Sequence, residues 1–268
     1  MSPRPPAPRF EDVTETTGIP VTDEGASMMF SRYAVAADLA AGRRVLELAC
    51  GGGNGLGLVG TKARFLVGGD FSAPLIRNAQ GHYGARFPLA RLSAEQLPFR
   101  GGSFDVVLFF EASYYVRDME AAFNEVARVL APGGTVMFVN ANPERPDFIH
   151  SPHSAHYHTA DEFRASLTRR GFTARVEGAF PIDPPSTGAL PKIKGAAFGL
   201  TRKMLEGLGL VPTTLRGRAR LKRLVFGRLR ELPPELPAGY APVEPRVAQD
   251  AGPVRGYKVL YVTAGRPS

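Results

Sequence analysis

The chain has 268 residues, of which 44% are hydrophobic, and this suits one large α/β domain with an elaboration. Its single cysteine, Cys50, excludes an internal disulfide and a cysteine metal cluster. No apolar run reaches the roughly 18 residues of a membrane helix, and the N-terminal MSPRPPAPRF has neither a basic start nor an apolar stretch. We therefore expect a cytoplasmic protein.

The formal net charge of +8 is concentrated in one segment. Between Leu190 and Arg230 there are eleven Lys or Arg against one acid, Glu206, so this segment carries +10 and the rest of the chain is close to neutral. The basic character is therefore local and needs a local explanation.

The first half of the chain alternates helical and strand-like patterns. Residues 1–25 begin with a Pro-rich stretch and are expected to form a flexible N-terminal arm. Helical spacing over 26–41 is followed by apolar runs typical of strands at 43–49, 64–70, 87–92, 104–110 and 134–140. This alternation predicts βαβ units and a doubly wound, mostly parallel sheet.

The second half completes this sheet and adds an insertion. A helix over 119–134 is expected to stop at Pro132, and Thr159 with Glu162 forms a capping box for a helix that Gly171 ends. Strands at 172–180 and 257–265 bring the expected total to seven.

The 76 residues between these last two strands, 181–256, are too many for a simple loop. They contain an amphipathic pattern with an apolar side and a basic side, made of Leu221, Leu224, Val225 and Leu229 against Arg216, Arg220, Arg223 and Arg230. The predicted organisation is an arm (1–25), a cofactor-binding Rossmann-like core (26–180), a basic helical insertion or cap (181–256), and the last core strand with a tail (257–268).

A glycine-rich motif, VLELACGGGNGLG, follows the first core strand from Val45 to Gly57. Glycines let a loop approach a nucleotide-like ligand closely, and a helix N-terminus offers free N–H groups. A dinucleotide pattern exists at Gly55, Gly57 and Gly60, but it would lie inside the following helix. We therefore favour a G-x-G-x-G loop made of Gly51, Gly53 and Gly55; an ordinary tight turn is the alternative.

An acid ends the next strand in the motif GGDFS, where Asp70 lies 19 residues after Gly51. A carboxylate at this position can accept hydrogen bonds from both hydroxyls of a ribose. A lone Asp at a strand end is more often a turn residue, and its distance from the glycine loop is what favours ribose binding.

With two further stretches, these motifs make the chain resemble the class I S-adenosylmethionine (SAM)-dependent methyltransferases. SAEQLPFRGGSFDVVLFFEASYYV (93–116) and EVARVLAPGGTVMF (125–138) match the family patterns "DAxxLPFxxxSFDxV" and "ExxRVLxPGG" in order and spacing. The resemblance covers residues 26–180 and the last strand. It implies SAM as cofactor and S-adenosylhomocysteine as product.

Carried over position by position, the resemblance implies a set of cofactor-binding residues. Glu47 would face the SAM amino group through the first loop, and Ala49 to Gly55 would surround the methionine part. Asp70 would hold the ribose, Phe71 would pack on the adenine, and Ser93, Ala94 and Glu95 would meet the adenine edge, with Glu111 also in the site. Two positions depart from the family: Ser93 replaces a usual Asp, and Ala49 a commoner Gly.

The acceptor side offers three groups of candidates. Tyr115, in the sequence after the fourth strand, would lie at the floor of the acceptor pocket, with a packing role as the alternative. The loop after the fifth strand holds four of the five histidines; we expect no metal site there, and His153 and His156 are candidate general bases beside the alternative of solvated loop residues. The basic insertion is the third group, for which a solvated helix face is the alternative.

The predicted function is therefore transfer of a methyl group from SAM to a small or medium-sized acceptor that carries an anionic group or a sugar. The tyrosine loop, the histidine loop and the basic cap together are similar to methyltransferases of bacterial polysaccharide and secondary-metabolite pathways. A nucleic-acid methyltransferase is a rival, although no KH or RRM module is visible and nucleic acid is not favoured as a partner. A non-catalytic SAM-binding partner protein is a second rival. No feature of the sequence defines an oligomeric state.

Overall fold

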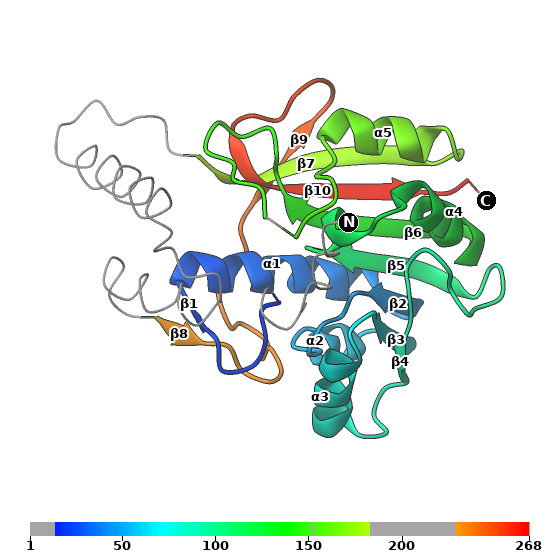
Figure 1. Cartoon of the computed structure of the whole chain (residues 1–268), viewed down its shortest axis with the longest axis vertical. Helices are drawn as coiled ribbons and strands as arrows, with labels where there is room; N and C mark the ends of the chain where they lie inside the picture. Colours follow the sequence, from blue (N-terminus) through cyan, green and yellow to red (C-terminus); the bar gives the residue numbers. More distant parts are fainter. Residues whose placement is uncertain (1–13, 152, 183–228, 268) are drawn as a thin grey trace, which may run out of the picture.

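The computed structural model describes residues 14–151, 153–182 and 229–267, which form a mixed sheet with helices on both faces. Eight strands follow the order β4-β3-β2-β5-β6-β10-β7-β9, visible from bottom to top in Figure 1. The five strands from β4 to β6 are parallel to one another. The expected α/β class and doubly wound, mostly parallel sheet are confirmed.

All seven expected strands form. They are β2 (Arg44–Leu48), β3 (Phe65–Asp70), β4 (Leu89–Arg91), β5 (Phe104–Phe110), β6 (Leu130–Ala141), β7 (Thr173–Pro181) and β10 (Tyr257–Gly265). β10 lies antiparallel between β6 and β7, and it pairs Leu260 with Asn140 on one side and with Gly178 on the other. The last strand of the chain therefore enters the interior of the sheet, which explains its continuous apolar pattern.

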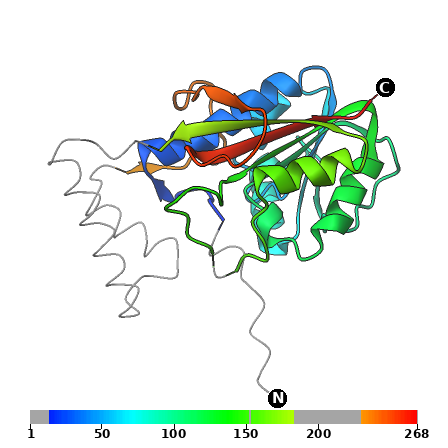
Figure 2. The same cartoon turned by 90° about the horizontal axis from the view of Figure 1, so that it is seen from above.

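The helices cover the two faces of the sheet, and Figure 2 shows the sheet between them. α1 (Asp23–Leu39), α2 (Leu56–Gly60) and α3 (Ala73–Tyr83) contribute to one buried cluster, and α4 (Met119–Val129) and α5 (Ala160–Thr168) contribute to the other. Neighbouring strand residues alternate between the clusters; Phe109 packs with α4 and Phe110 with α1. This alternation is the period-2 pattern of a sheet buried on both faces.

Side-chain caps set two of the helix starts. The Thr22 hydroxyl accepts a hydrogen bond from Gly25 N at 3.0 Å, so α1 begins three residues earlier than expected. At α5 the predicted capping box is confirmed, because Thr159 accepts from Glu162 N and Glu162 accepts from Thr159 N.

Four features differ from the sequence expectations. Helix α4 ends at Val129, before Pro132, and β6 begins at once. A short strand, β9 (Arg246–Gln249), was not predicted; it pairs antiparallel with β7 and extends the sheet to eight strands. β1 (Pro20–Val21), within the expected arm, pairs with β8 (Arg230–Glu231). The described part of the expected helical insertion, 229–256, contains β8 and β9 and no helix.

β1 and β8 form a two-stranded sheet of their own, and Asn54 of the glycine loop donates to Pro233 O just after β8. The predicted basic helix, with Arg216, Arg220 and Arg223, lies outside the described residues. In the three described ranges, no helix has the length and apolar character that a membrane span requires.

Candidate active site

The glycine loop connects β2 to α2 at the carboxyl edge of the sheet. Gly57 and Gly60 lie within α2, so the glycines free to line a loop are Gly51, Gly53 and Gly55, the register that the sequence favoured. Gly51 and Gly53 have φ of 58° and 85°, and Ala49 shares this left-handed region with φ of 57°. The Ala49 backbone is therefore strained where a Gly would be relaxed.

Gly55 allows close packing of Tyr33 under the loop. A Cβ at Gly55 would lie 2.0 Å from Cε1 of Tyr33, whose ring is buried and in edge contact with Phe110. The ring has no room to retreat. Packing of Tyr33 beneath the loop therefore requires a glycine at position 55, whether or not a ligand is bound.

We expect Gly55→Ala to reduce the free energy of unfolding by about 3 kcal/mol, since overpacking a rigid site displaces the ring or the loop. The thermal midpoint should fall by roughly 6 to 12 °C. Gly52→Ala is the matched control, because its Cβ would meet nothing closer than 3.5 Å. Calorimetric midpoints of the two variants, and of Gly55→Ala combined with Tyr33→Ala, test this; equal stability of Gly55→Ala and Gly52→Ala would contradict it.

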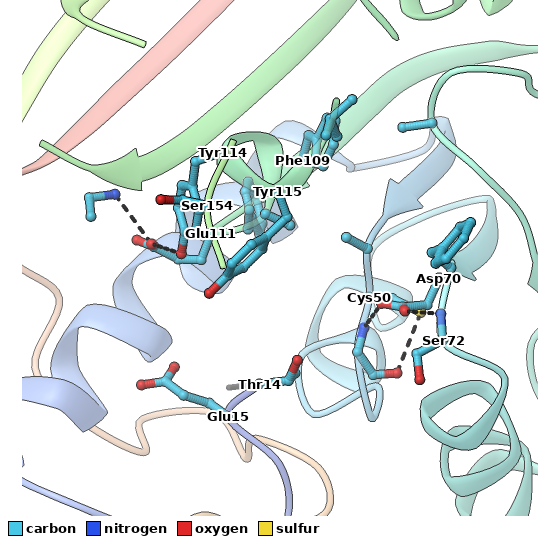
Figure 3. A pocket seen from close by; sticks show the side chains of 18 of the residues that line it. Thr14, Glu15, Cys50, Asp70, Ser72, Phe109, Glu111, Tyr114, Tyr115 and Ser154 are labelled. Carbon is cyan, nitrogen blue, oxygen red and sulfur yellow. Dashed lines mark hydrogen bonds between the residues drawn. The ribbon is translucent and has the colours of Figure 1, made fainter. Parts of the chain in front are cut away.

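Asp70 ends β3 and caps the glycine loop. Its Oδ2 accepts from Gly51 N at 2.9 Å and its Oδ1 accepts from Ser72 N at 2.8 Å. The carboxylate is buried in the protein but lines the cavity described below, beside Cys50 and Ser72 (Figure 3). A hydrogen-bond acceptor held by two amides therefore lies where the strands β2 and β3 end.

A cavity of about 1100 Å³ opens at this edge of the sheet. Small-ligand sites commonly have roughly 300 to 1000 Å³, so the cavity is large enough for more than one small molecule. One half contains the glycine loop and Asp70, and the other contains Glu111 and the tyrosines that follow β5 (Figure 3).

The predicted adenine-side residues line the first half. Phe71 is 55% exposed, with the Arg91 guanidinium 5.6 Å from its ring centroid. Ser93, Ala94 and Glu95 also line the cavity, but Glu95 Oε1 accepts from the backbone N–H groups of residues 117 and 118 at 3.1 and 3.0 Å. The Glu95 carboxylate therefore anchors the start of α4. Sequence reasoning missed Arg91, which extends from the short strand β4.

Glu47 was expected to face the SAM amino group through the glycine loop, and its side chain lies in the protein interior. It is 1% exposed beneath the loop and does not line the cavity. Its Oε1 accepts from the Tyr33 hydroxyl at 2.7 Å, and its Oε2 is buried without a hydrogen-bond partner in the described part of the chain. Burial raises the pKa of Glu47 to about 7, although the Tyr33 hydrogen bond and the nearby Arg32 oppose this.

The raised pKa makes Glu47 a source of pH-dependent stability. Because the folded state holds this proton more tightly than the unfolded state, the contribution is full below the unfolded pKa of about 4.5 and is lost as the pH rises through 7. We expect the free energy of unfolding of wild type, relative to Glu47→Gln, to fall by the order of 2 kcal/mol over this window. Urea unfolding of both proteins at pH 5, 6, 7 and 8 without cofactor measures it, and a pH-independent difference would be inconsistent with a protonated Glu47.

The second half of the cavity is built on Glu111 and the short helix η2 (Ser113–Tyr115). Glu111 was expected among the cofactor-binding residues, but its Oε2 accepts from the Tyr114 hydroxyl at 3.1 Å and from Ala141 N at 3.2 Å. Burial raises the pKa of Glu111, and its φ of 49° marks a strained backbone. Tyr115 lies between this group and the Asp70 loop in Figure 3.

The histidine loop contributes one histidine to the cavity. Ala155 N donates to Tyr114 O at 2.7 Å and ties the loop to η2, and His153 and Ser154 line the cavity. The expectation for His156 is corrected: its Nε2 lies 3.1 Å from Glu162 Oε1 at the start of α5, away from the cavity lining. His156 contacts the capping residue Glu162 and packs against His158 with ring centroids 4.6 Å apart, whereas His153 lines the cavity.

Three cations that the sequence did not single out also line the cavity: Arg32 from α1, Arg145 from the loop after β6, and Lys258 from β10. Arg32 is 7% exposed, and its Nη2 contacts Glu15 Oε2 at 3.3 Å. The helical pattern over 26–41 places Arg32 on a helix but does not say which face it occupies. Thr14 and Glu15 also line the cavity, and the segment that carries them is held by the Arg32–Glu15 contact, by a hydrogen bond from Asn54 to Thr17 and by the pairing of β1 with β8.

The fold and cavity define the class of doubly wound α/β proteins that hold a nucleotide-like ligand at the carboxyl ends of their strands. A family profile described as a methyltransferase domain matches residues 46–138. The demethylmenaquinone methyltransferase of Thermus thermophilus is 31% identical over 175 residues, which cover 62% of this chain and 76% of that protein. The chain belongs to the class I SAM-dependent methyltransferases, a family of the EC 2.1.1 type with SAM as cofactor.

Other similarities are more partial. A probable phthiotriol/phenolphthiotriol dimycocerosates methyltransferase of Mycobacterium ulcerans is 36% identical over 43% of this chain and 45% of its own length. The chain thus spans about half the length of several curated relatives that it matches. A solved SAM-dependent methyltransferase of Mesorhizobium loti shares the fold with a TM-score of 0.52 at 18% identity, over 89% of this chain and all of that chain.

Proposed function

We propose that this protein transfers the methyl group of SAM to a small-molecule acceptor bound at the tyrosine half of the cavity. The observation that carries the proposal is the continuity of the cavity. One half of the cavity holds the glycine loop and the Asp70 carboxylate. The other half holds Glu111 and the tyrosines, and the two halves form one continuous space. A cofactor in one half and an acceptor in the other can therefore come into contact within the cavity.

The residues of the first half suit SAM. The Asp70 carboxylate ends β3 beside the glycine loop and lines the cavity, where it would accept hydrogen bonds from ribose hydroxyls. The exposed Phe71 ring, with Arg91 beside it, would stack on the adenine. Ser93 and Ala94 would contact the edge of the adenine. The loop from Ala49 to Gly55 would surround the methionine part, and Glu47 would act on it from beneath.

Bound SAM supplies an activated methyl group on a sulfonium, and the protein must place the acceptor atom about 3 to 3.5 Å from it. If the acceptor is a hydroxyl, a base must also remove its proton. We favour Glu111 over His153 and Tyr115, because burial raises the basicity of its carboxylate and two hydrogen bonds hold it in place. Tyr115 and His153 would shape the pocket around the acceptor.

The acceptor half suits a molecule with an apolar body. Met28, Met29 and Val259 line the cavity together with the tyrosines. The two relatives named above are described as acting on phthiotriol dimycocerosates and on demethylmenaquinone, which supports a lipid-like or quinol acceptor over nucleic acid. The sugar or anionic character expected from the basic segment rests on residues that the structure does not describe.

A screen for acceptor-dependent release of S-adenosylhomocysteine tests this proposal. The protein is incubated with SAM and, separately, a hydroquinone, a long-chain diol, a hydrophobic acid, a sugar and an oligonucleotide. We expect release at least about tenfold above the acceptor-free rate with an apolar acceptor and none with the oligonucleotide. Tight S-adenosylhomocysteine binding without turnover on any acceptor would instead favour the non-catalytic alternative.

A further inference from the structure

Arg32 lines the cavity, and the hydrogen-bonding capacity of its guanidinium is incompletely used. Its side chain is 9% exposed, and its Nε is buried without a hydrogen-bond partner among the described residues. Its Nη2 contacts Glu15 Oε2 at 3.3 Å, longer than the 2.7 to 2.9 Å usual for a charge-assisted bond. Nε and Nη2 together form the edge of a guanidinium that binds a carboxylate through two parallel hydrogen bonds.

Glu15 fills this position only loosely. Its side chain is 40% exposed, and it belongs to the N-terminal segment that crosses the cavity opposite Glu111 and Tyr115 (Figure 3). A buried guanidinium needs an anionic partner, but nothing in the contact fixes Glu15 as that partner. A carboxylate delivered from the cavity can take the place of Glu15 and, once Glu15 has moved away, pair with Nε as well.

The charged residues around Arg32 favour a ligand group with a single negative charge. Arg145 and Lys258 line the same cavity, and the acids paired with them, Asp147 and Glu24, are 65% and 52% exposed. Glu111 also lies close enough to interact electrostatically with Arg32. A dianion would meet repulsion from Glu111, whereas a carboxylate carries the same single charge as the Glu15 that it would replace.

We propose that Arg32 binds a carboxylate of the acceptor, and that Glu15 occupies this subsite until the acceptor arrives. The inference rests on the proposed function, because it gives the acceptor of that reaction a carboxylate in addition to its apolar body. This carboxylate anchors the acceptor in the cavity, and a different atom of the acceptor receives the methyl group.

Calorimetric titrations with octanoate test the subsite, with octanol as the neutral counterpart and inorganic phosphate as the other anion. They are run with and without S-adenosylhomocysteine, so failure of the cofactor to bind would contradict the proposed function alone. The proteins are wild type, Glu15→Gln, Arg32→Lys and the control Asp23→Asn. Asp23 is an equally charged residue, 82% exposed and paired with Arg230, that does not line the cavity.

We expect octanoate to bind wild type more tightly than octanol or phosphate. Glu15→Gln should tighten octanoate binding about two- to fivefold, because it removes a partly exposed competitor. Arg32→Lys should weaken octanoate binding about tenfold, since the lysine ammonium keeps the positive charge but cannot donate two parallel hydrogen bonds to the carboxylate. Asp23→Asn should have no effect. Unchanged or weaker octanoate binding in Glu15→Gln, or preference for phosphate or octanol, would overturn the proposal.

Discussion

Glu111→Gln is expected to lower acceptor-dependent turnover by about 10²- to 10⁴-fold, the usual cost of removing a general base. The amide keeps an oxygen that can accept from the Tyr114 hydroxyl and from Ala141 N, so the strained turn at residue 111 should keep its shape. The amide cannot take a proton from the acceptor. The loss should therefore appear in kcat, with little change in the affinity for S-adenosylhomocysteine.

Initial rates with an acceptor from the release screen, together with calorimetric dissociation constants, measure this effect. His156→Gln is the matched control: the sequence made His156 a candidate base, and the structure places it against Glu162 outside the cavity. We expect its turnover to match wild type. Full activity in Glu111→Gln would remove Glu111 from the reaction and return His153 and Tyr115 to consideration.

Asp70→Ala is expected to weaken S-adenosylhomocysteine binding by about 10- to 150-fold, equivalent to roughly 1.5 to 3 kcal/mol for lost hydrogen bonds to a charged group. Two effects act together. The ribose loses its acceptor, and the amides of Gly51 and Ser72 lose the carboxylate that holds the loop in place.

Asp70→Asn separates these effects. The Asn keeps one oxygen and can cap one of the two amides, so we expect a smaller loss of affinity and a smaller loss of stability. Calorimetric titration gives the affinities, and thermal midpoints without ligand report the state of the loop. An unchanged dissociation constant in a folded Asp70→Ala protein would exclude Asp70 from the cofactor site.

Most of the fold could be predicted because its elements are locally encoded. Apolar runs bounded by turn residues marked all seven core strands, and a two-residue pattern, Thr159 with Glu162, marked the start of α5. β9 was not predicted because it is only four residues long and partly polar. These residues form a strand only by pairing with β7, some 70 residues away in the sequence. The same applies to β1 and β8, which are two residues each.

The candidate site was predictable where it follows the strand ends. Asp70, Phe71, Ser93 and Tyr115 reach the cavity because consecutive parallel strands end at one edge. Positions that depend on helix rotation or on distant segments could not be predicted. Tyr33 covers Glu47 from below the loop, and Arg32 lines the cavity from the same helix. Neighbours in sequence were also separated, since His153 lines the cavity and His156 contacts Glu162.

Calorimetric titration of the whole protein with SAM tests whether the cavity beside the glycine loop binds this cofactor. We predict saturable binding of one SAM per chain, competition by S-adenosylhomocysteine, and a higher thermal midpoint with either ligand, because each binds the folded state alone. NADH should not bind, since the dinucleotide pattern at Gly55, Gly57 and Gly60 runs into α2. Binding of NADH with no response to SAM or S-adenosylhomocysteine would contradict the account.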